Sequence, residues 1–250
     1  MRMLVTNDDG INAAGIRALA EYLSSLGEVY VVAPAEQQSA KSQSVTFLTE
    51  VIVQETEVPG AVKAYSLAGT PTDCVNWGIS AFRRSGIEFD YVFSGINLGA
   101  NIGLANYYSG TIAAAREGAL QGVRSIALSV GTLSASEFDY ILSAIPELMK
   151  MSDSLSPATF LSVNAPNLPA NEIKGLKVAE VAPWGYGDKY VFDKVGRRRY
   201  QLNLYRRDPG ATELRYDFDW YFKGYTVVSP ITTHASDDDA LRILNDGFGG

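Results

Sequence analysis

Two adjacent aspartates, Asp8 and Asp9, follow a short apolar run over residues 3–6 and precede Gly10. Like charges held this close raise each other's pKa unless a cation lies between them. The pair therefore indicates a metal site or, on the simpler interpretation, an Asx-turn or a cap of the following helix. An isolated Asp-Asp-Gly does not decide between the two.

Ser39 and Asn97 each follow another predicted strand and offer a neutral oxygen. In an open parallel sheet, ligands bind outside the carboxyl ends of the strands. Two carboxylates and two neutral oxygens form a hard ligand set that suits magnesium, manganese or calcium rather than zinc. The chain has one histidine, His234, and one cysteine, Cys74, too few for a zinc finger, a disulfide scaffold or an iron–sulfur cluster.

Ser109, Gly110 and Thr111 stand where an alanine-rich helix is predicted to begin. The first-turn N–H groups of a helix bind anions, so a phosphate could lie there; ordinary capping by Ser109 or Thr111 is the alternative. Another helix start, over residues 69–73, has Thr70 or Asp73 available as caps. The three glycines at positions 95, 99 and 103 match neither the dinucleotide fingerprint nor the phosphate loop.

Alternating strands and helices must position these residues. Apolar runs predict strands over residues 3–6, 29–33, 91–94, 125–130 and 159–163, and helical spacing predicts helices over residues 16–26, 110–121 and 137–151. This alternation predicts an α/β fold with a Rossmann-like, doubly wound, mostly parallel sheet. Residues 45–66 alternate apolar and polar side chains around Pro59-Gly60, which predicts a β-hairpin excursion.

The C-terminal part has a different character. We expect a catalytic core over residues 1–182 and a β-hairpin-rich extension over residues 183–250 that serves oligomerisation, with turns at Gly185, Gly187, Gly196 and Pro209-Gly210. A last helix is predicted to follow Ser236 as its N-cap. The cluster of Arg197, Arg198 and Arg199 indicates a solvated hairpin or a subunit contact, or a surface that steers phosphorylated substrates.

Charge and hydropathy limit the partners. The 250 residues carry a net charge of −7, which repels nucleic acid and anionic membranes. No run approaches the roughly 18 apolar residues of a membrane span, and the first ten residues lack the apolar core of a signal peptide. We therefore expect a soluble, cytoplasmic protein that binds neither a nucleic-acid duplex nor a membrane.

Four segments occur together in a fixed order: Val-Thr-Asn-Asp-Asp-Gly at residues 5–10, Gly-Thr-Pro-Thr-Asp-Cys-Val at 69–75, Ser-Gly-Ile-Asn-Leu-Gly-Ala-Asn at 94–101 and Tyr-Ser-Gly-Thr at 108–111. In this the chain resembles the SurE (stationary-phase survival protein) nucleotidases over at least residues 1–130. The resemblance implies a Rossmann-like core and a metal-dependent phosphomonoesterase that is active on nucleoside 5′- and 3′-monophosphates. Some members of the family also trim short polyphosphate. A homodimer or homotetramer that exchanges C-terminal elements is implied too.

The resemblance also implies site residues. Asp8, Asp9, Ser39 and Asn97 are expected to hold one Mg²⁺ or Mn²⁺ per subunit, and the phosphate is expected to lie among Asn7, Asn101, Ser109, Gly110 and Thr111. The sequence around Ser39 departs from the family pattern, so Ser42 or Ser44 is the alternative ligand. Residues 216–225 lack the Gly-Thr-Asp pattern of the family, which bears on the oligomer geometry.

The expected catalytic residues are Asp8 and Asp9. In the mechanism we expect, a metal-bound water attacks the phosphate and Asp8 accepts its proton. An aspartyl-phosphate formed on Asp8 or Asp9 is the rival route. The alternative function is a nucleotide- or metal-binding protein of the same fold without catalysis.

Overall fold

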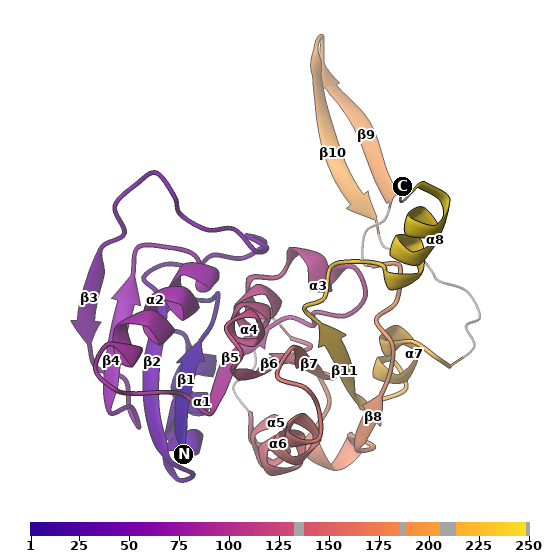
Figure 1. The fold of residues 1–250 in the computed structure, drawn as a ribbon. Helices are drawn as coiled ribbons and strands as arrows, with labels where there is room; N and C mark the ends of the chain where they lie inside the picture. Colours follow the sequence, from indigo (N-terminus) through magenta and orange to yellow (C-terminus); the bar gives the residue numbers. More distant parts are fainter. Residues whose placement is uncertain (133–137, 186–188, 206–213, 249–250) are drawn as a thin grey trace.

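The computed structural model describes residues 1–132, 138–185, 189–205 and 214–248. Within these residues a nine-stranded sheet has the order β3-β4-β2-β1-β5-β6-β7-β11-β8, and β9 and β10 pair separately (Figure 1). The elements in chain order are β1 (Arg2–Thr6), α1 (Ala14–Ser24), β2 (Glu28–Pro34), β3 (Val53–Thr56), β4 (Lys63–Leu67), α2 (Pro71–Arg83), β5 (Tyr91–Leu98), α3 (Ala105–Tyr108), α4 (Gly110–Leu120), β6 (Arg124–Val130), α5 (Asp139–Ser143), α6 (Ile145–Asp153), β7 (Thr159–Ala165), the 3-10 helix η1 (Ala170–Glu172), β8 (Leu176–Val178), β9 (Lys189–Gly196), β10 (Arg199–Tyr205), α7 (Asp217–Tyr221), β11 (Thr226–Thr232) and α8 (Asp238–Phe248).

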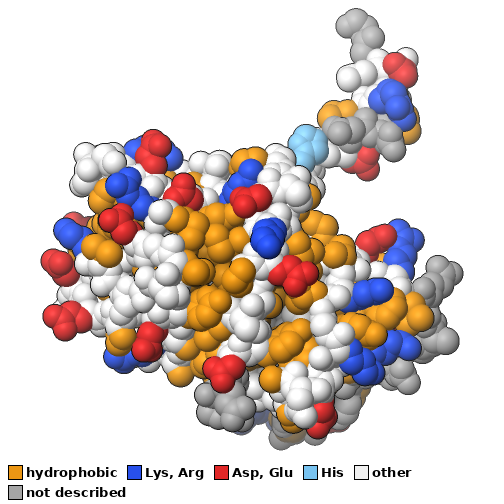
Figure 2. All heavy atoms as spheres, turned by 90° about the horizontal axis from the view of Figure 1, so that it is seen from below, with side chains coloured by type: hydrophobic (Ala, Val, Ile, Leu, Met, Phe, Trp, Pro, Cys, Tyr) orange, Lys and Arg blue, Asp and Glu red, His pale blue; other side chains and the backbone are white. Residues whose placement is uncertain are grey.

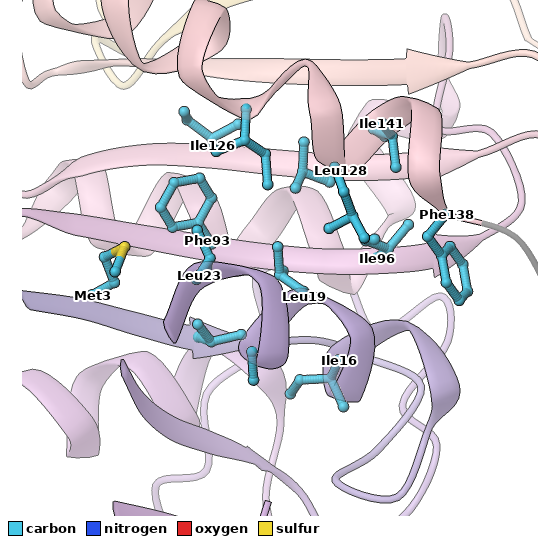
Figure 3. Packing of buried hydrophobic residues seen from close by; sticks show 14 of the residues in the cluster. Met3, Ile16, Leu19, Leu23, Phe93, Ile96, Ile126, Leu128, Phe138 and Ile141 are labelled. Carbon is cyan, nitrogen blue, oxygen red and sulfur yellow. The ribbon is translucent and has the colours of Figure 1, made fainter. Parts of the chain in front are cut away.

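Helices cover both faces of the sheet, as predicted for a doubly wound fold. The six strands from β4 to β7 in the sheet order run parallel. Because successive side chains of a strand point to opposite faces, Met3 and Val5 pack with α1, α5 and α6, whereas Leu4 packs with α2. Figure 3 shows the first of these layers, with Ile16 and Leu19 of α1 against the strands that carry Phe93, Ile96 and Ile126.

Strand β5 is longer than predicted. The prediction ended it at Ser94 and placed Asn97 in a glycine-rich loop, but the strand continues to Leu98. The pairing with β6 shifts register between Ser94 and Asn97 and then resumes, with Asn97 opposite Ser129. Asn97 therefore lies on a strand of the sheet, where backbone pairing fixes it.

The helix predicted over residues 137–151 is two helices, α5 and α6. Ala144 separates them, and Pro146 lies in the first turn of α6. Proline has no N–H group to donate to the preceding turn, so it is tolerated where a helix begins and interrupts a continuous one. Residue 137 lies outside the described residues.

Two predicted additions to the core turn out to contribute to its sheet. The excursion over residues 45–66 contains the hairpin β3–β4, but β4 pairs parallel with β2 and so extends the main sheet. In the C-terminal extension β9 and β10 form the expected antiparallel hairpin, with Arg197 and Arg198 in its turn. Strand β11, however, returns to the core and pairs antiparallel with β7. The turns expected at Gly187 and at Pro209-Gly210 lie outside the described residues.

The last helix, α8, stands away from the body of the molecule (Figures 1 and 2). Its first turn is capped by Asp237, whose Oδ1 accepts the Ala240 N–H at 2.9 Å, rather than by the predicted Ser236. Figure 2 shows the single histidine, His234, at the base of this projecting segment. Across the ranges that the structure describes, we find no helix with the length and apolarity needed to cross a membrane.

Candidate metal and phosphate site

The carboxyl end of β1 meets the first turn of α4. Asp8 is only 3% exposed, and its Oδ1 accepts the hydroxyl of Thr111. A Cβ atom added to Gly110 would lie 2.8 Å from Asp8 Cβ and 3.1 Å from Asp8 Oδ2, so only a glycine lets the helix approach this closely. The structure thus brings Asp8 together with Gly110 and Thr111, which are 102 and 103 positions further along the chain.

Burial shifts the ionisation of both aspartates of the site. Burial raises the pKa of Asp8 to about 6 from 3.8; the hydrogen bond from Thr111 opposes this rise and the charge of Asp9 adds to it. Burial also raises the pKa of Asp9. Within the described residues neither Asp8 nor Asp9 forms an ion pair, in contrast to Glu28 with Arg2 and Asp153 with Arg124. A cation would relieve the cost of keeping both ionised.

The extension of β5 brings Asn97 to the same place. The Leu98 N–H donates weakly to Asp9 Oδ2 at 3.4 Å, which ties the strand end to the second aspartate. The side-chain Nδ2 of Asn97 donates to the Gly99 carbonyl at 2.7 Å. This bond turns the amide nitrogen toward the chain and leaves the amide oxygen as the group that could face a cation.

Ser39 lies on a segment that is bound directly to the aspartates. The Gln38 N–H donates to the Asp8 carbonyl at 2.7 Å, and Gln37 Nε2 lies 3.4 Å from Asp9 Oδ1. Ser39 itself is exposed. Of its two alternatives, Ser42 donates its hydroxyl to the Tyr107 carbonyl at 2.6 Å, and the Ser44 carbonyl accepts the Thr70 hydroxyl at 2.7 Å. We therefore retain Ser39 as the predicted third ligand.

Asn7 and Asn101 have structural partners. Asn7 Nδ2 donates to the Gly10 carbonyl at 2.9 Å, and the Gly10 N–H donates back to Asn7 Oδ1 at 3.2 Å. Asn101 is bonded to two other strands; its N–H donates to Asn164 Oδ1 at 2.6 Å and its Nδ2 to Ser129 Oγ at 3.0 Å. Both asparagines shape the loops around the site, and contact with phosphate stays a prediction for them.

Ser109 combines the two roles that the sequence left open. It is the N-cap of α4, and its Oγ accepts the Ile112 N–H at 3.3 Å. The first turn of this 11-residue helix faces Asp8, so its N–H groups and its dipole lie at the site. Capping by Ser109 is therefore observed, and it leaves the anion-binding geometry of the helix start in place.

Two other residues that the sequence singled out lie elsewhere. Cys74 is fully buried, and burial raises the pKa of its thiol well above the ordinary value, as befits a small core residue rather than a nucleophile. His234 is exposed on the projecting C-terminal segment. The contacts of Gln37 and Gln38 with the aspartates were not predicted from the sequence, because no local sequence pattern indicates them.

Comparisons with known proteins find relatives over nearly the whole chain. The family model described as "Survival protein SurE" matches residues 3–188. A Clostridium botulinum protein named "5′-nucleotidase SurE" is 38% identical over 244 residues, covering 92% of this chain and 93% of that protein. One of the same name from Chlorobium phaeobacteroides is 36% identical over 248 residues, with coverage of 97% and 94%. The crystal structure of a SurE protein from Aquifex aeolicus is similar, with a TM-score of 0.85, 31% identity and coverage of 98% and 99%.

Proposed function

The chain belongs to the SurE family, and on this premise we propose that it is a metal-dependent 5′-nucleotidase. It hydrolyses nucleoside 5′-monophosphates to nucleoside and phosphate, and nucleoside 3′-monophosphates and short polyphosphate are further substrates. The observation that carries the proposal is the buried carboxyl of Asp8, which forms no ion pair within the described residues, against the first turn of α4. A cation-binding group and an anion-binding helix start in contact suit a phosphate ester with its metal ion.

The proposed metal ligands are Asp8, Asp9, Asn97 and Ser39, which would hold one Mg²⁺ or Mn²⁺ per subunit. Their chemistry fits a hard cation, because all four offer oxygen. In the described part of the chain no group of three or more His, Cys, Asp or Glu side chains gathers at one place. Two carboxylates completed by neutral oxygens are therefore the ligand set that this site provides.

The proposed phosphate site is the start of α4, formed by Ser109, Gly110 and Thr111, with Asn7 and Asn101 in the surrounding loops. When bound, the cation would neutralise charge on the phosphate oxygens and activate the attacking water. Asp8 Oδ1 accepts the Thr111 hydroxyl and keeps a second lone pair for the cation, so Oδ2, beside Gly110, is the oxygen that would accept the proton of the water. The water oxygen would bond to phosphorus as the ester bond breaks, and the proton taken up by Asp8 would pass to the leaving oxygen, directly or through solvent, so that the nucleoside leaves as an alcohol and the Asp8 carboxylate is restored.

Metal dependence is the first test. Chelation should abolish phosphate release from a chromogenic monoester, and Mn²⁺ or Mg²⁺ should restore it, because the carboxylates alone cannot neutralise the phosphate. A panel of nucleoside 5′- and 3′-monophosphates and tripolyphosphate then measures the substrate range by released phosphate. Nucleotide binding without any hydrolysis would favour the non-catalytic alternative. Recovery of phosphate label on Asp8 or Asp9 after rapid quenching would replace direct attack by water with the aspartyl-phosphate route.

We also propose that the chain forms a homodimer or homotetramer through its C-terminal region. The hairpin β9–β10 and helix α8 expose large apolar side chains, namely Phe192, Val195, Tyr200, Leu202, Leu241, Ile243 and Leu244. Such side chains favour burial against a partner. Sedimentation should give two or four times the mass of one chain, and Phe192→Glu should shift it toward one chain; a monomeric wild-type protein would refute the proposal.

A further inference from the structure

One segment links the proposed metal ligands to the start of α2. No strand or helix forms over residues 35–52, between β2 and β3. We call residues 37–48 the strap. At its beginning the strap is bound to Asp8 through the Gln38 N–H, and at its middle Ser42 donates its N–H to the Tyr108 carbonyl at 3.0 Å. The strap therefore runs along the rim of the site, and Ser39 lies within it.

Asp73 holds the other end of the strap. Its Oδ1 accepts the Thr46 N–H at 3.0 Å and its Oδ2 accepts the Thr46 hydroxyl at 2.6 Å. Beside it, the Thr70 hydroxyl donates to the Ser44 carbonyl at 2.7 Å. Burial raises the pKa of Asp73, but the hydrogen bonds from Thr46 and Thr70 outweigh it, so the pKa lies below its usual value.

Capping of α2 does not account for these contacts. A capping box needs the Asp73 side chain to accept the Thr70 N–H, and it does so at 2.9 Å. The two bonds from Thr46 come from a residue 27 positions away and add nothing to the cap. Ordering a loop residue costs conformational entropy. A segment without secondary structure thus depends on such bonds for a fixed position.

We propose that Asp73 is a positioning residue for the metal and phosphate site. It fixes the strap through Thr46 and thereby holds in place the segment that carries Ser39, which is bound to Asp8 through the Gln38 N–H. The proposal rests on the proposed function for the role of the strap, but its structural part, that Asp73 orders the strap, does not depend on any reaction. The two can therefore be tested separately.

The strap contains a built-in reporter, Lys41. It is the only lysine or arginine between Arg17 and Lys63, so tryptic cleavage after Lys41 reports release of the strap in the full-length protein. Asp73→Asn replaces one carboxylate oxygen by an NH₂ group, which cannot accept a hydrogen bond. The variant therefore loses part of the contact with Thr46. Thr46→Val removes the hydroxyl and leaves the α2 capping box intact.

We expect both variants to speed cleavage after Lys41 at least about tenfold when cleavage is limited by local opening. Direct Mn²⁺ binding, measured by electron paramagnetic resonance, should weaken by about 10–100-fold in Asp73→Asn, the range found for groups that orient metal ligands. The kcat/KM for a nucleoside monophosphate should fall with it. In a double-mutant cycle Asp73→Asn should cost less in the Thr46→Val background, because the two share one interaction.

Asp90→Asn is the matched control. Asp90 Oδ2 accepts the Arg2 N–H at 2.7 Å, so it also joins two segments far apart in the sequence, but at the amino ends of β1 and β5. This variant should leave Lys41 cleavage and Mn²⁺ binding unchanged.

The proposal is overturned if Asp73→Asn and Thr46→Val lower only the melting temperature and leave cleavage and Mn²⁺ binding as in the wild type. If Asp73→Asn does not fold, Thr46→Val decides alone. Faster cleavage without any nucleotidase activity in the wild type would contradict the proposed function and not the ordering of the strap.

Discussion

Asp8→Asn should lose about 10²–10⁴-fold in kcat/KM, the range for removal of a proton-transfer group, and should at the same time stabilise the metal-free protein at neutral pH. The change is nearly isosteric, and the asparagine oxygen can still accept the Thr111 hydroxyl, so the fold is kept. What disappears is a charge in a buried position that has no cation partner among the described residues. Activity and stability should therefore change in opposite directions.

Proton linkage explains why Asp8→Asn should raise the stability of the metal-free protein. Asp8 has a pKa of about 6 in the folded protein against 3.8 when exposed, so the folded state binds the proton more tightly. The metal-free protein should therefore lose stability as the pH rises from about 4 to about 6, and the full cost persists above that. At about 1.4 kcal/mol per pH unit the cost amounts to about 3 kcal/mol. Asn cannot ionise, so the Asp8→Asn variant does not lose this stability.

Thermal unfolding in the presence of chelator measures this effect. At pH 7.5 we expect the melting temperature of Asp8→Asn to exceed that of the wild type by roughly 6–12 °C, and the gap should shrink at pH 5. Mn²⁺ should stabilise the wild type more than the variant, since a cation replaces the proton. Asp90→Asn is a suitable comparison because it changes an aspartate at the opposite edge of the sheet. A variant less stable than the wild type at pH 7.5, or one with full activity, would contradict the assignment of Asp8.

The parts of the fold that could be predicted are those whose information is local. Strand β1, helix α1 and strand β2 follow from apolar spacing, because each element is buried on the face that its own sequence marks. The end of β5 could not be predicted in this way. Gly95 and Asn97 favour a loop locally, and only pairing with Ser129 and Val130 of β6 makes the segment a strand. The antiparallel pairing of β11 with β7 likewise depends on a distant strand.

The candidate site divides in the same way. Asp8, Asp9 and Ser109 stand at ends of predicted elements, so their placement at one edge of the sheet could be predicted. The partners of Asp73 could not, because the sequence offers a sufficient local explanation for that residue as a helix cap. Its bonds to Thr46 depend on the path of the strap, a segment with no periodicity to interpret.

Gly15→Ala should destabilise the protein by about 3 kcal/mol, at the upper end of the range for overpacking, although alanine is normally favoured over glycine in a helix by about 1 kcal/mol. A Cβ atom on Gly15 would lie 2.0 Å from the Ile96 carbonyl oxygen and 2.9 Å from its carbonyl carbon. Both are backbone atoms of β5, so no side-chain rotation relieves the clash, and α1 must move away from the strand. Chemical denaturation of the metal-free protein measures the loss.

The same substitution should also reach the metal site, since Ile96 directly precedes Asn97 on β5. Displacing this strand moves the amide oxygen of Asn97, so Mn²⁺ binding should weaken in molecules that are still folded. Arg17→Ala, on the exposed side of α1, should stay within about ±0.5 kcal/mol of the wild type and bind Mn²⁺ normally. A Gly15→Ala protein as stable as the wild type would show that α1 can separate from β5 without cost. Strand β6 also contacts this part of β5, because Asn97 pairs with Ser129. Lower stability with unchanged Mn²⁺ affinity would therefore show that the pairing with β6 is sufficient to hold Asn97 in place.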